Sequence, residues 1–74
     1  MSKSDQNNAV YRVTEVVGTS SASWEEAVKN AVNVASKSLR DLRIAEVVKL
    51  DVKIEDGKVT TFRARLALSF KYEA

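Results

Sequence analysis

The clearest pattern in the chain is a run over residues 24–39 that is apolar on one side and polar on the other. At about 100° per residue in a helix, its charged and amide residues fall on a different arc from its apolar residues. Ser23 followed by Glu26 has the form of a capping box, in which each residue satisfies a backbone N–H group of the other. We therefore predict a helix over residues 24–39 that serves as scaffold. Its apolar arc, which we expect to be core, consists of Trp24, Ala27, Val28, Ala31, Val32, Val34, Ala35 and Leu39.

Three further segments have the character of β-strands. Residues 10–17 are rich in β-branched side chains, and residues 44–54 and 58–72 alternate between apolar and polar positions. Gly18 and the small polar residues after it predict a turn between the first strand and the helix. In residues 10–17 both alternating sets are partly apolar, which indicates that both faces of this strand are covered. One helix covers only one face, so we expect a second subunit on the other.

The segment Glu55-Asp56-Gly57 predicts a hairpin between the last two strands. The apolar sets of both strands fall on even-numbered positions, so they share one face only if even positions pair with even positions. A three-residue loop with Gly57 in the left-handed conformation satisfies this condition. The resulting prediction places Leu50 opposite Phe62 and Val48 opposite Ala64, and the helix on a bed of Leu50, Val52, Phe62, Leu66 and Phe70.

The opposite face of the same two strands is rich in basic residues. In the predicted register Lys49 lies opposite Arg63, a mildly unfavourable pair of like charges, and Asp51 lies diagonal to Arg63. Two adjacent cations beside one acid suggest an anionic partner or a carboxylate from a neighbouring subunit. A solvated strand face without a partner is the interpretation that we favour, because exposed charges on strands are common and their pairing is weak.

The length and the composition indicate a single domain that needs partners. The chain has 74 residues, of which residues 1–8 are polar and aperiodic, so we expect a disordered N-terminal tail there and one domain over residues 9–74. A domain this small buries only about 60% of the surface of its unfolded chain and commonly needs a disulfide, a metal or partner subunits. The sequence has no Cys and no His, which leaves oligomerisation as the expected solution.

The same composition narrows the function. Twelve Lys and Arg against ten Asp and Glu give a net charge of +2, which is too balanced to indicate nucleic-acid binding. No apolar run approaches the ~20 residues of a membrane span, and the first residues do not resemble a signal peptide, so we expect a cytoplasmic protein without membrane or nucleic-acid partners. Without His or Cys the usual pairs of nucleophile and base cannot be built, so we do not expect an enzyme.

The order strand, helix, long strand, hairpin, long strand is an α+β fold with β-α-β-β connectivity, and it resembles the dodecins. Residues 11–20 (YRVTEVVGTS) are similar to the opening strand and turn of that family, and residues 45–48 (AEVV) to the start of its second strand. Residues 56–59 (DGKV) and 62–70 (FRARLALSF) are similar to its hairpin and third strand. The resemblance covers residues 11–72 and implies a three-stranded antiparallel sheet wrapped around one helix, in a hollow homododecamer of cubic 23 symmetry.

The resemblance also implies where a ligand would bind. Flavin-binding dodecins store flavins such as FMN or riboflavin in pairs at two-fold axes, with a Trp stacked on the ring and a Gln bonded to its polar edge. The Trp position is Ile44 in this sequence and the Gln position is Arg63. Ile44 has no π-face for stacking, and Arg63 only donates hydrogen bonds, so both departures weigh against flavin. The candidate ligand-binding residues are those at and beside the two positions: Ile44, Ala45, Glu46, Arg63 and Arg65.

Two short segments, Ser23-Trp24-Glu25 and Leu42-Arg43-Ile44-Ala45, resemble a divergent branch of the family. Members of this branch are associated with calcium rather than flavin, and the resemblance does not assign the calcium site to particular residues. We therefore expect a self-assembling protein that binds and stores a small ligand. A calcium- or other ion-binding protein and a purely structural assembly without a dedicated ligand are the alternatives.

Overall fold

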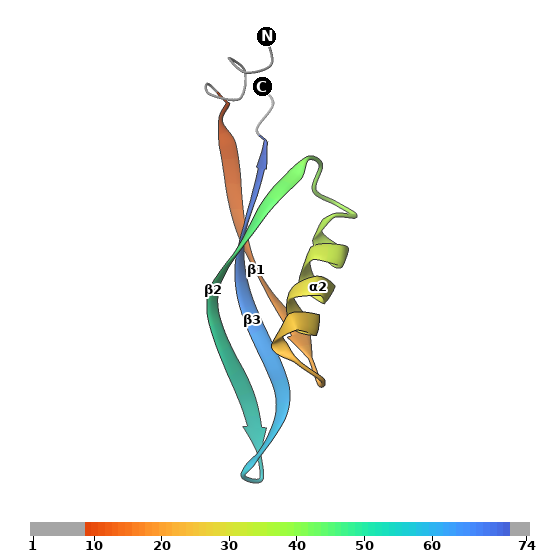
Figure 1. Ribbon diagram of the computed structural model, residues 1–74, viewed down its shortest axis with the longest axis vertical. Helices are drawn as coiled ribbons and strands as arrows, with labels where there is room; N and C mark the ends of the chain where they lie inside the picture. The colour runs from red at the N-terminus through yellow and green to blue at the C-terminus, as the bar shows by residue number, and fades with distance from the viewer. Residues whose placement is uncertain (1–8, 72–74) are drawn as a thin grey trace.

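The computed structural model describes residues 9–71, which form one helix and three strands (Figure 1). The expected tail at residues 1–8 and the last three residues of the chain lie outside this described part. The elements are β1 (Tyr11–Ser20), α2 (Trp24–Ala35), β2 (Leu42–Glu55) and β3 (Lys58–Lys71). Their order confirms the predicted α+β fold with β-α-β-β connectivity.

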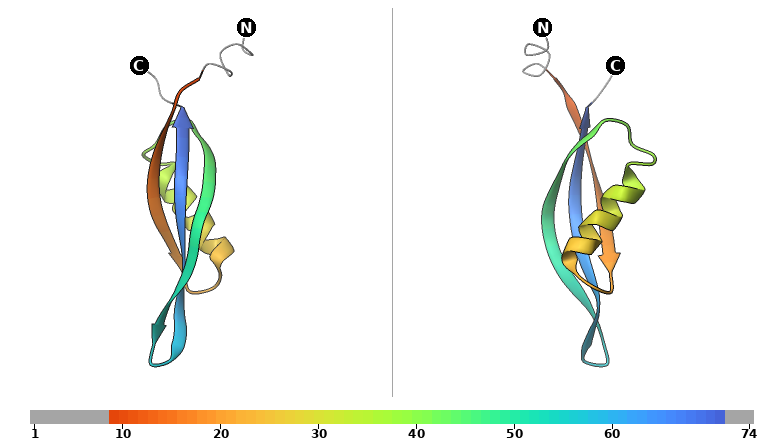
Figure 2. Two further views of the ribbon diagram at one scale, coloured as in Figure 1. Left: turned by 90° about the vertical axis from the view of Figure 1, so that its left-hand side faces the viewer. Right: turned by 45° about the vertical axis from the view of Figure 1, so that its right-hand side comes forward.

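The three strands form one antiparallel sheet in which β3 lies between β1 and β2. The sheet is long and twisted, and α2 lies against one of its faces (Figure 2). The molecule measures 56 × 20 × 17 Å, and the hairpin of β2 and β3 extends well beyond the start of α2 (Figure 1). Within residues 9–71, no helix is long and apolar enough to cross a membrane. Because α2 covers only one face, the other face of the sheet is open to contacts from outside the chain.

The start of α2 is fixed by two serines. The backbone N–H of Glu26 donates to Ser23 Oγ at 3.0 Å, as the capping-box pattern predicts. The carboxylate of Glu26 instead accepts from Ser20 Oγ at 2.8 Å, and Ser20 Oγ accepts from the Ser23 N–H at 3.4 Å. Ser20 therefore replaces the second half of the box. It is in place to do so because β1 continues to Ser20, whereas we predicted that the strand would give way to a turn at Gly18.

The helix α2 ends at Ala35, earlier than the predicted end at Leu39. The hydroxyl of Ser36 donates to the carbonyl of Asn33 at 3.1 Å, and that of Ser38 donates to the carbonyl of Ala35 at 3.4 Å. Serine side chains that bond to nearby carbonyls compete with continuation of a helix. Leu39 still contacts the core from the turns that follow, so the apolar pattern extends past the helix that it predicts.

The hairpin turns through two residues, Asp56 and Gly57, and not through the predicted three. Glu55 pairs with Lys58, and both turn residues have positive φ, 52° and 75°, as type I′ turns require. The left-handed Gly57 is thus confirmed. Between Lys49 and Lys53, even positions still pair with even positions, because a bulge leaves Thr60 unpaired and shifts the register by one residue. The predicted pairs are wrong by two positions: Leu50 lies opposite Ala64, Val52 lies opposite Phe62, and Val48 falls at a second bulge.

The core is a narrow layer of small and aliphatic side chains between α2 and β3. Alanines spaced four residues apart on α2 bring the helix very close to the sheet, where a Cβ atom added to Gly18 of β1 would lie 2.1 Å from the carbonyl oxygen of Ala27. The close approach explains why β1 carries a glycine at this position. The buried apolar residues are Ala27, Ala31, Ala35, Ala64, Leu66 and Leu68, and Val16, Val28, Val32, Leu39 and Leu42 pack around them.

The helix covers less of the sheet than we predicted. Its twelve residues span only about 18 Å, about a third of the long dimension of the molecule. Leu66 is buried beneath it as predicted, whereas Leu50 is 46% exposed. Trp24 and Val34, predicted as core, are 39% and 67% exposed. Trp24 instead meets the edge of Phe62, with ring centroids 5.1 Å apart. The other predicted bed positions, Val52, Phe62 and Phe70, are half-buried.

Candidate functional site

The face of the sheet away from α2 carries four of the five candidate residues, and we call it the outer face. Side chains alternate between the two faces along a strand, so the odd-numbered residues of β1 and β3 belong to it. Strand pairing arranges the outer face in four cross-strand rows, each with one residue from β1, β3 and β2 in that order. The rows are Thr19, Arg63 and Asp51; Val17, Arg65 and Lys49; Glu15, Ala67 and Glu46; and Val13, Ser69 and Ile44.

The first row contains a bidentate ion pair between Arg63 and Asp51. Arg63 donates from Nε and Nη2 to the two carboxylate oxygens of Asp51, at 2.8 and 3.2 Å. This hydrogen bonding holds the pKa of Asp51 below its ordinary value and raises the pKa of Arg63 above its own. We predicted a diagonal arrangement, but the two residues lie directly opposite because the register differs from the predicted one. The cation at the predicted ligand position is therefore already paired within its own chain.

The second row holds the like-charge pair, at a different place from the predicted one. Lys49 lies opposite Arg65 and not opposite Arg63. Arg65 is relieved by Glu15 of β1, whose carboxylate lies 3.5 Å from its guanidinium. Lys49 makes no ion pair with any described residue. In the four rows acids and bases alternate, and Lys49 is the cation of these rows that a partner carboxylate could still pair.

Ile44 and Arg63 lie far apart on the outer face. Ile44 is opposite Ser69, which is six residues along β3 from Arg63, and at about 3.3 Å per residue this separation is roughly 20 Å. The side chain of Ile44 is 56% exposed. A single chain therefore does not bring the two implied flavin-contact positions together, and a pocket that uses both would need a second copy.

The remaining candidates divide between the two faces. Glu46 and Arg65 lie on the outer face in adjacent rows, whereas Ala45 lies opposite Leu68 and so belongs to the face that carries α2. Two pairs of candidates are neighbours along one strand of the outer face. Ile44 and Glu46 are neighbours on β2, and Arg63 and Arg65 are neighbours on β3. The proximity in sequence of Ala45 to Ile44 does not place it in the same site, because successive strand residues point to opposite faces.

Glu15 is a residue of this face that the sequence did not identify. It lies beside Ala67 on one side, as Glu46 does on the other. The alternation of Tyr11, Val13 and Glu15 indicated that they share a face, but nothing in the sequence says which strand lies beside β1. Within residues 9–71, no group of three or more His, Cys, Asp or Glu side chains is placed to hold a metal ion. One chain thus supplies two carboxylates of the kind that calcium prefers, in one row but separated by the width of β3, and not a full set of ligands.

A sheet wrapped around one helix, with its second face open and charged, defines a class of small α+β domains that leave one sheet face for partners or ligands. Comparison with known proteins identifies the class. The family model for Dodecin matches residues 10–73, and the chain belongs to the dodecin family. The resemblance found in the sequence is thereby confirmed.

Several relatives and solved structures are similar to this chain. The protein named calcium dodecin from Mycobacterium tuberculosis is 40% identical over 63 residues, which are 85% of this chain and 89% of that one. The structure of dodecin from Streptomyces coelicolor is 48% identical with a TM-score of 0.85, and covers 90% of this chain and 96% of its own. A structure of the M. tuberculosis calcium dodecin, described as calcium-chelating with a calcium-binding site, is 42% identical with a TM-score of 0.77 and covers 86% and 91%.

Proposed function

We propose that this chain is the subunit of a hollow dodecamer that binds and stores a small ligand. The observation that supports assembly is the number of large apolar side chains left exposed on the single chain, in positions that include the hairpin tip. Exposed apolar surface on this scale marks interaction sites, and a two-stranded ribbon is marginally stable alone. The exposed residues are Val10, Tyr11, Val13, Val17, Trp24, Val34, Ile44, Val47, Val48, Leu50, Ile54 and Val59.

Light scattering on the purified protein tests the assembly. A dodecamer has a mass of about 98 kDa, twelve times the 8.2 kDa of one chain. The substitution Ile54→Lys at the exposed hairpin tip is expected to lower this mass, and Lys29→Glu on the polar side of α2 serves as the control. A wild-type mass near that of one chain would contradict the proposal.

We further propose that calcium, rather than flavin, is the ligand of the outer face. Ile44 stands where the family resemblance implies a Trp, and an aliphatic side chain offers a flavin no stacking surface. Glu15 and Glu46 supply carboxylate oxygens on either side of Ala67. Calcium takes six to eight oxygen ligands, so the proposed site would draw further carboxylates, carbonyls or waters from adjoining copies. The relative from M. tuberculosis named calcium dodecin, and its structure described with a calcium-binding site, support this choice.

Calorimetry with calcium chloride on chelator-treated protein tests the ion. We expect saturable heat that Glu46→Gln abolishes and that Glu25→Gln, on the exposed side of α2, leaves unchanged. No heat and no rise in melting temperature with calcium would contradict calcium binding. In parallel, quenching of FMN or riboflavin fluorescence at low micromolar concentration would restore flavin as the ligand despite Ile44.

A structural assembly without a dedicated ligand is the second candidate function. The specific observation in its favour is that the outer face already neutralises most of its own charge, through Asp51 with Arg63 and Glu15 with Arg65. Neither candidate includes a catalytic step, in keeping with a sequence that has no His and no Cys. A dodecamer that binds neither calcium nor flavin in the two titrations would favour this candidate.

A further inference from the structure

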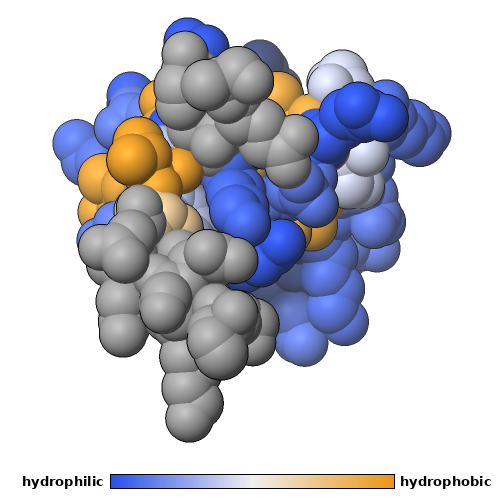
Figure 3. Space-filling model, turned by 90° about the horizontal axis from the view of Figure 1, so that it is seen from above, coloured by the Kyte–Doolittle hydropathy of each residue, from blue (hydrophilic) through white to orange (hydrophobic). Residues whose placement is uncertain are grey.

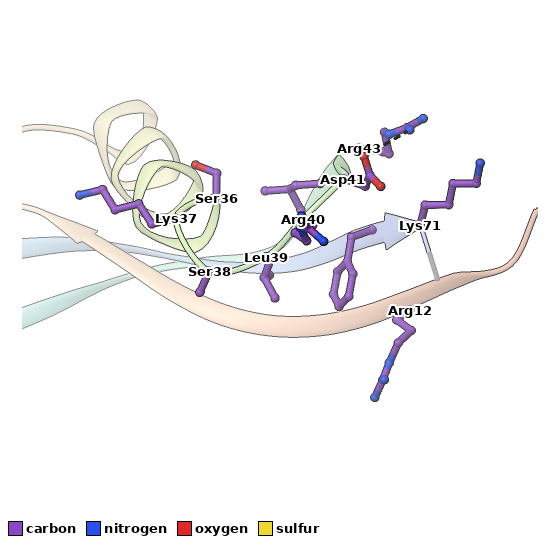
Figure 4. Close-up of a pocket in the computed structure, with 11 residues that line it drawn as sticks. Arg12, Ser36, Lys37, Ser38, Leu39, Arg40, Asp41, Arg43 and Lys71 are labelled. Carbon is purple, nitrogen blue, oxygen red and sulfur yellow. Dashed lines mark ion pairs between the residues drawn. The ribbon is translucent and has the colours of Figure 1, made fainter. Parts of the chain in front are cut away.

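A second charged region lies where the chain leaves α2 and enters β2, and it shares only Lys71 with the outer face. An open cavity of about 1130 Å³ lies among the segment between the two elements, the first residues of β1 and β2, and the last residues of β3. Figure 4 shows the side chains around it. The cavity is comparable in size to pockets that hold small-molecule ligands. Five of its lining residues are basic and one is acidic: Arg12, Lys37, Arg40, Arg43 and Lys71, with Asp41.

This cavity holds more than the net positive charge of the described chain. Residues 9–71 contain eleven Lys and Arg and eight Asp and Glu, so six basic and seven acidic residues remain outside the cavity. Seen from above, the coloured surface of the molecule is mostly hydrophilic with smaller hydrophobic patches (Figure 3). The overall balance that argued against a polyanionic partner therefore conceals a strongly polarised distribution of charge.

Three of these five cations have no ion-pair partner among the described residues. Arg43 lies 3.7 Å from the carboxylate of Asp41, whereas Lys37, Arg40 and Lys71 make no ion pair with any described residue. The end of α2 adds a partial negative charge of about one half, which four net positive charges exceed. Elsewhere in residues 9–71, four of the six basic residues are ion-paired.

The backbone holds this basic segment in a defined shape. Asp41 has a φ of 55°, in the left-handed region that Asp and Asn tolerate better than most residues. Its carbonyl accepts a hydrogen bond from the backbone N–H of Lys71 at 3.3 Å, which ties the segment to β3. Figure 4 shows that the basic side chains extend in different directions, with Arg40 between Lys37 on one side and Lys71 and Arg43 on the other. They do not converge on one point.

We propose that this cavity binds the oligophosphate group of a small molecule. A chain of phosphates spans several separated cations at once, whereas a single phosphate reaches only one or two of them. Arg fits phosphate oxygens with two parallel hydrogen bonds, and Lys contributes a point charge. The proposal goes beyond the proposed function, because it concerns a different part of the molecule and does not depend on calcium or flavin.

Calorimetry of the full-length, assembled protein with sodium tripolyphosphate tests the proposal. We expect saturable binding that is about tenfold to a hundredfold weaker in the double variant Arg40→Gln and Lys71→Gln. The double variant Lys29→Gln and Lys58→Gln removes the same charge from α2 and the hairpin, and binding should stay close to wild type. Equal weakening in both double variants would mean that net charge alone attracts the anion, and it would overturn the proposal.

The variant Asp41→Asn provides a test that does not rely on loss of binding. Asn also tolerates positive φ, so the backbone should be kept while Arg43 is released. Binding of tripolyphosphate is then expected to tighten by about threefold to tenfold. Inorganic orthophosphate that binds as tightly as tripolyphosphate, or an absence of saturable heat with tripolyphosphate, would overturn the proposal. A mixed-sequence RNA that displaces bound tripolyphosphate at equal phosphate concentration would also overturn it, in favour of a nucleic-acid surface.

Discussion

The two faces of β3 alternate residue by residue and yet hold the molecule together to very different degrees. On the side of α2, Ala64, Leu66 and Leu68 are completely buried. One position away, Arg63 and Arg65 remain partly exposed in ion pairs. Burial of one leucine stabilises a fold by about 1.5–3 kcal/mol, whereas exposed ion pairs contribute little. The inner face therefore stabilises the single chain, and the outer face depends on what covers it.

The largest effect expected from this comparison is at Leu66. The substitution Leu66→Ala should cost about 2–5 kcal/mol, because it opens a cavity beneath α2 that the alanines around it cannot fill. Arg65→Ala, on the neighbouring position of the outer face, should cost far less. Melting temperatures from circular dichroism, taken at one protein concentration because assembly adds to stability, give the comparison. Similar losses at both positions would show that the outer face is as tightly packed as the inner one.

Substitutions at the two glycines distinguish the cost of steric overlap, at Gly18, from the cost of a positive φ, at Gly57. Gly18→Ala should cost about 1–3 kcal/mol, because the new Cβ atom would lie 2.1 Å from the carbonyl of Ala27 and the helix must move. Gly57→Ala meets no atom within 4 Å, so its cost of about 1–2 kcal/mol would come only from the positive φ. Gly57→Asn should recover most of that loss, whereas Gly18→Asn should be worse than Gly18→Ala. Recovery by Asn at both positions would contradict the packing explanation for Gly18.

The periodic features of the sequence predicted the centre of the inner face, although not its extent, since Trp24, Val34 and Leu50 are exposed. Ser23 caps α2 and Leu66 lies beneath the helix, because capping and apolar periodicity act over a few residues. The hairpin was predicted with the correct pairing of even positions but for the wrong reason. A bulge at Thr60, and not a longer loop, supplies the extra residue that brings even positions opposite even positions. The alternation of apolar and polar residues in the two strands does not indicate where such a bulge lies.

The outer face was predicted less completely, since it depends on contacts between distant segments. Arg63 and Arg65 were recognised as candidates, and Asp51 was expected diagonally beside Arg63 rather than directly opposite it. The partner of Arg65 was missed, because Glu15 is brought alongside only by the order of the strands. The same limit applies to the basic cavity. Its cations come from β1, β2, β3 and the segment after α2, and the balanced net charge of the whole sequence gives no sign that they gather in one place.

Trp24 connects the helix to the edge of the sheet, and its substitution should have an intermediate effect. Its indole Nε1 donates to the backbone carbonyl of Asp51 at 3.0 Å. Trp24→Phe keeps an aromatic ring against Phe62 but removes this donor, so it should cost about 0.5–1.5 kcal/mol. Trp24→Leu loses both contacts and should cost more. The midpoint of urea unfolding provides the measurement, and a Phe variant as stable as wild type would show that the hydrogen bond contributes nothing.

The smallest expected effect is that of the ion pair between Asp51 and Arg63, and its dependence on pH identifies it. Because Arg63 holds the pKa of Asp51 below its ordinary value of 3.8, the unfolded chain binds more protons than the folded chain as the pH falls. The stabilisation is therefore complete above about pH 5 and is lost as the pH falls through the lowered pKa. Asp51→Asn should be slightly less stable than wild type at pH 6, and the two melting temperatures should converge as the pH approaches about 2. A difference that persists at the lowest pH would show that the carboxylate of Asp51 acts through its shape or its neutral hydrogen bonds, and not through its charge.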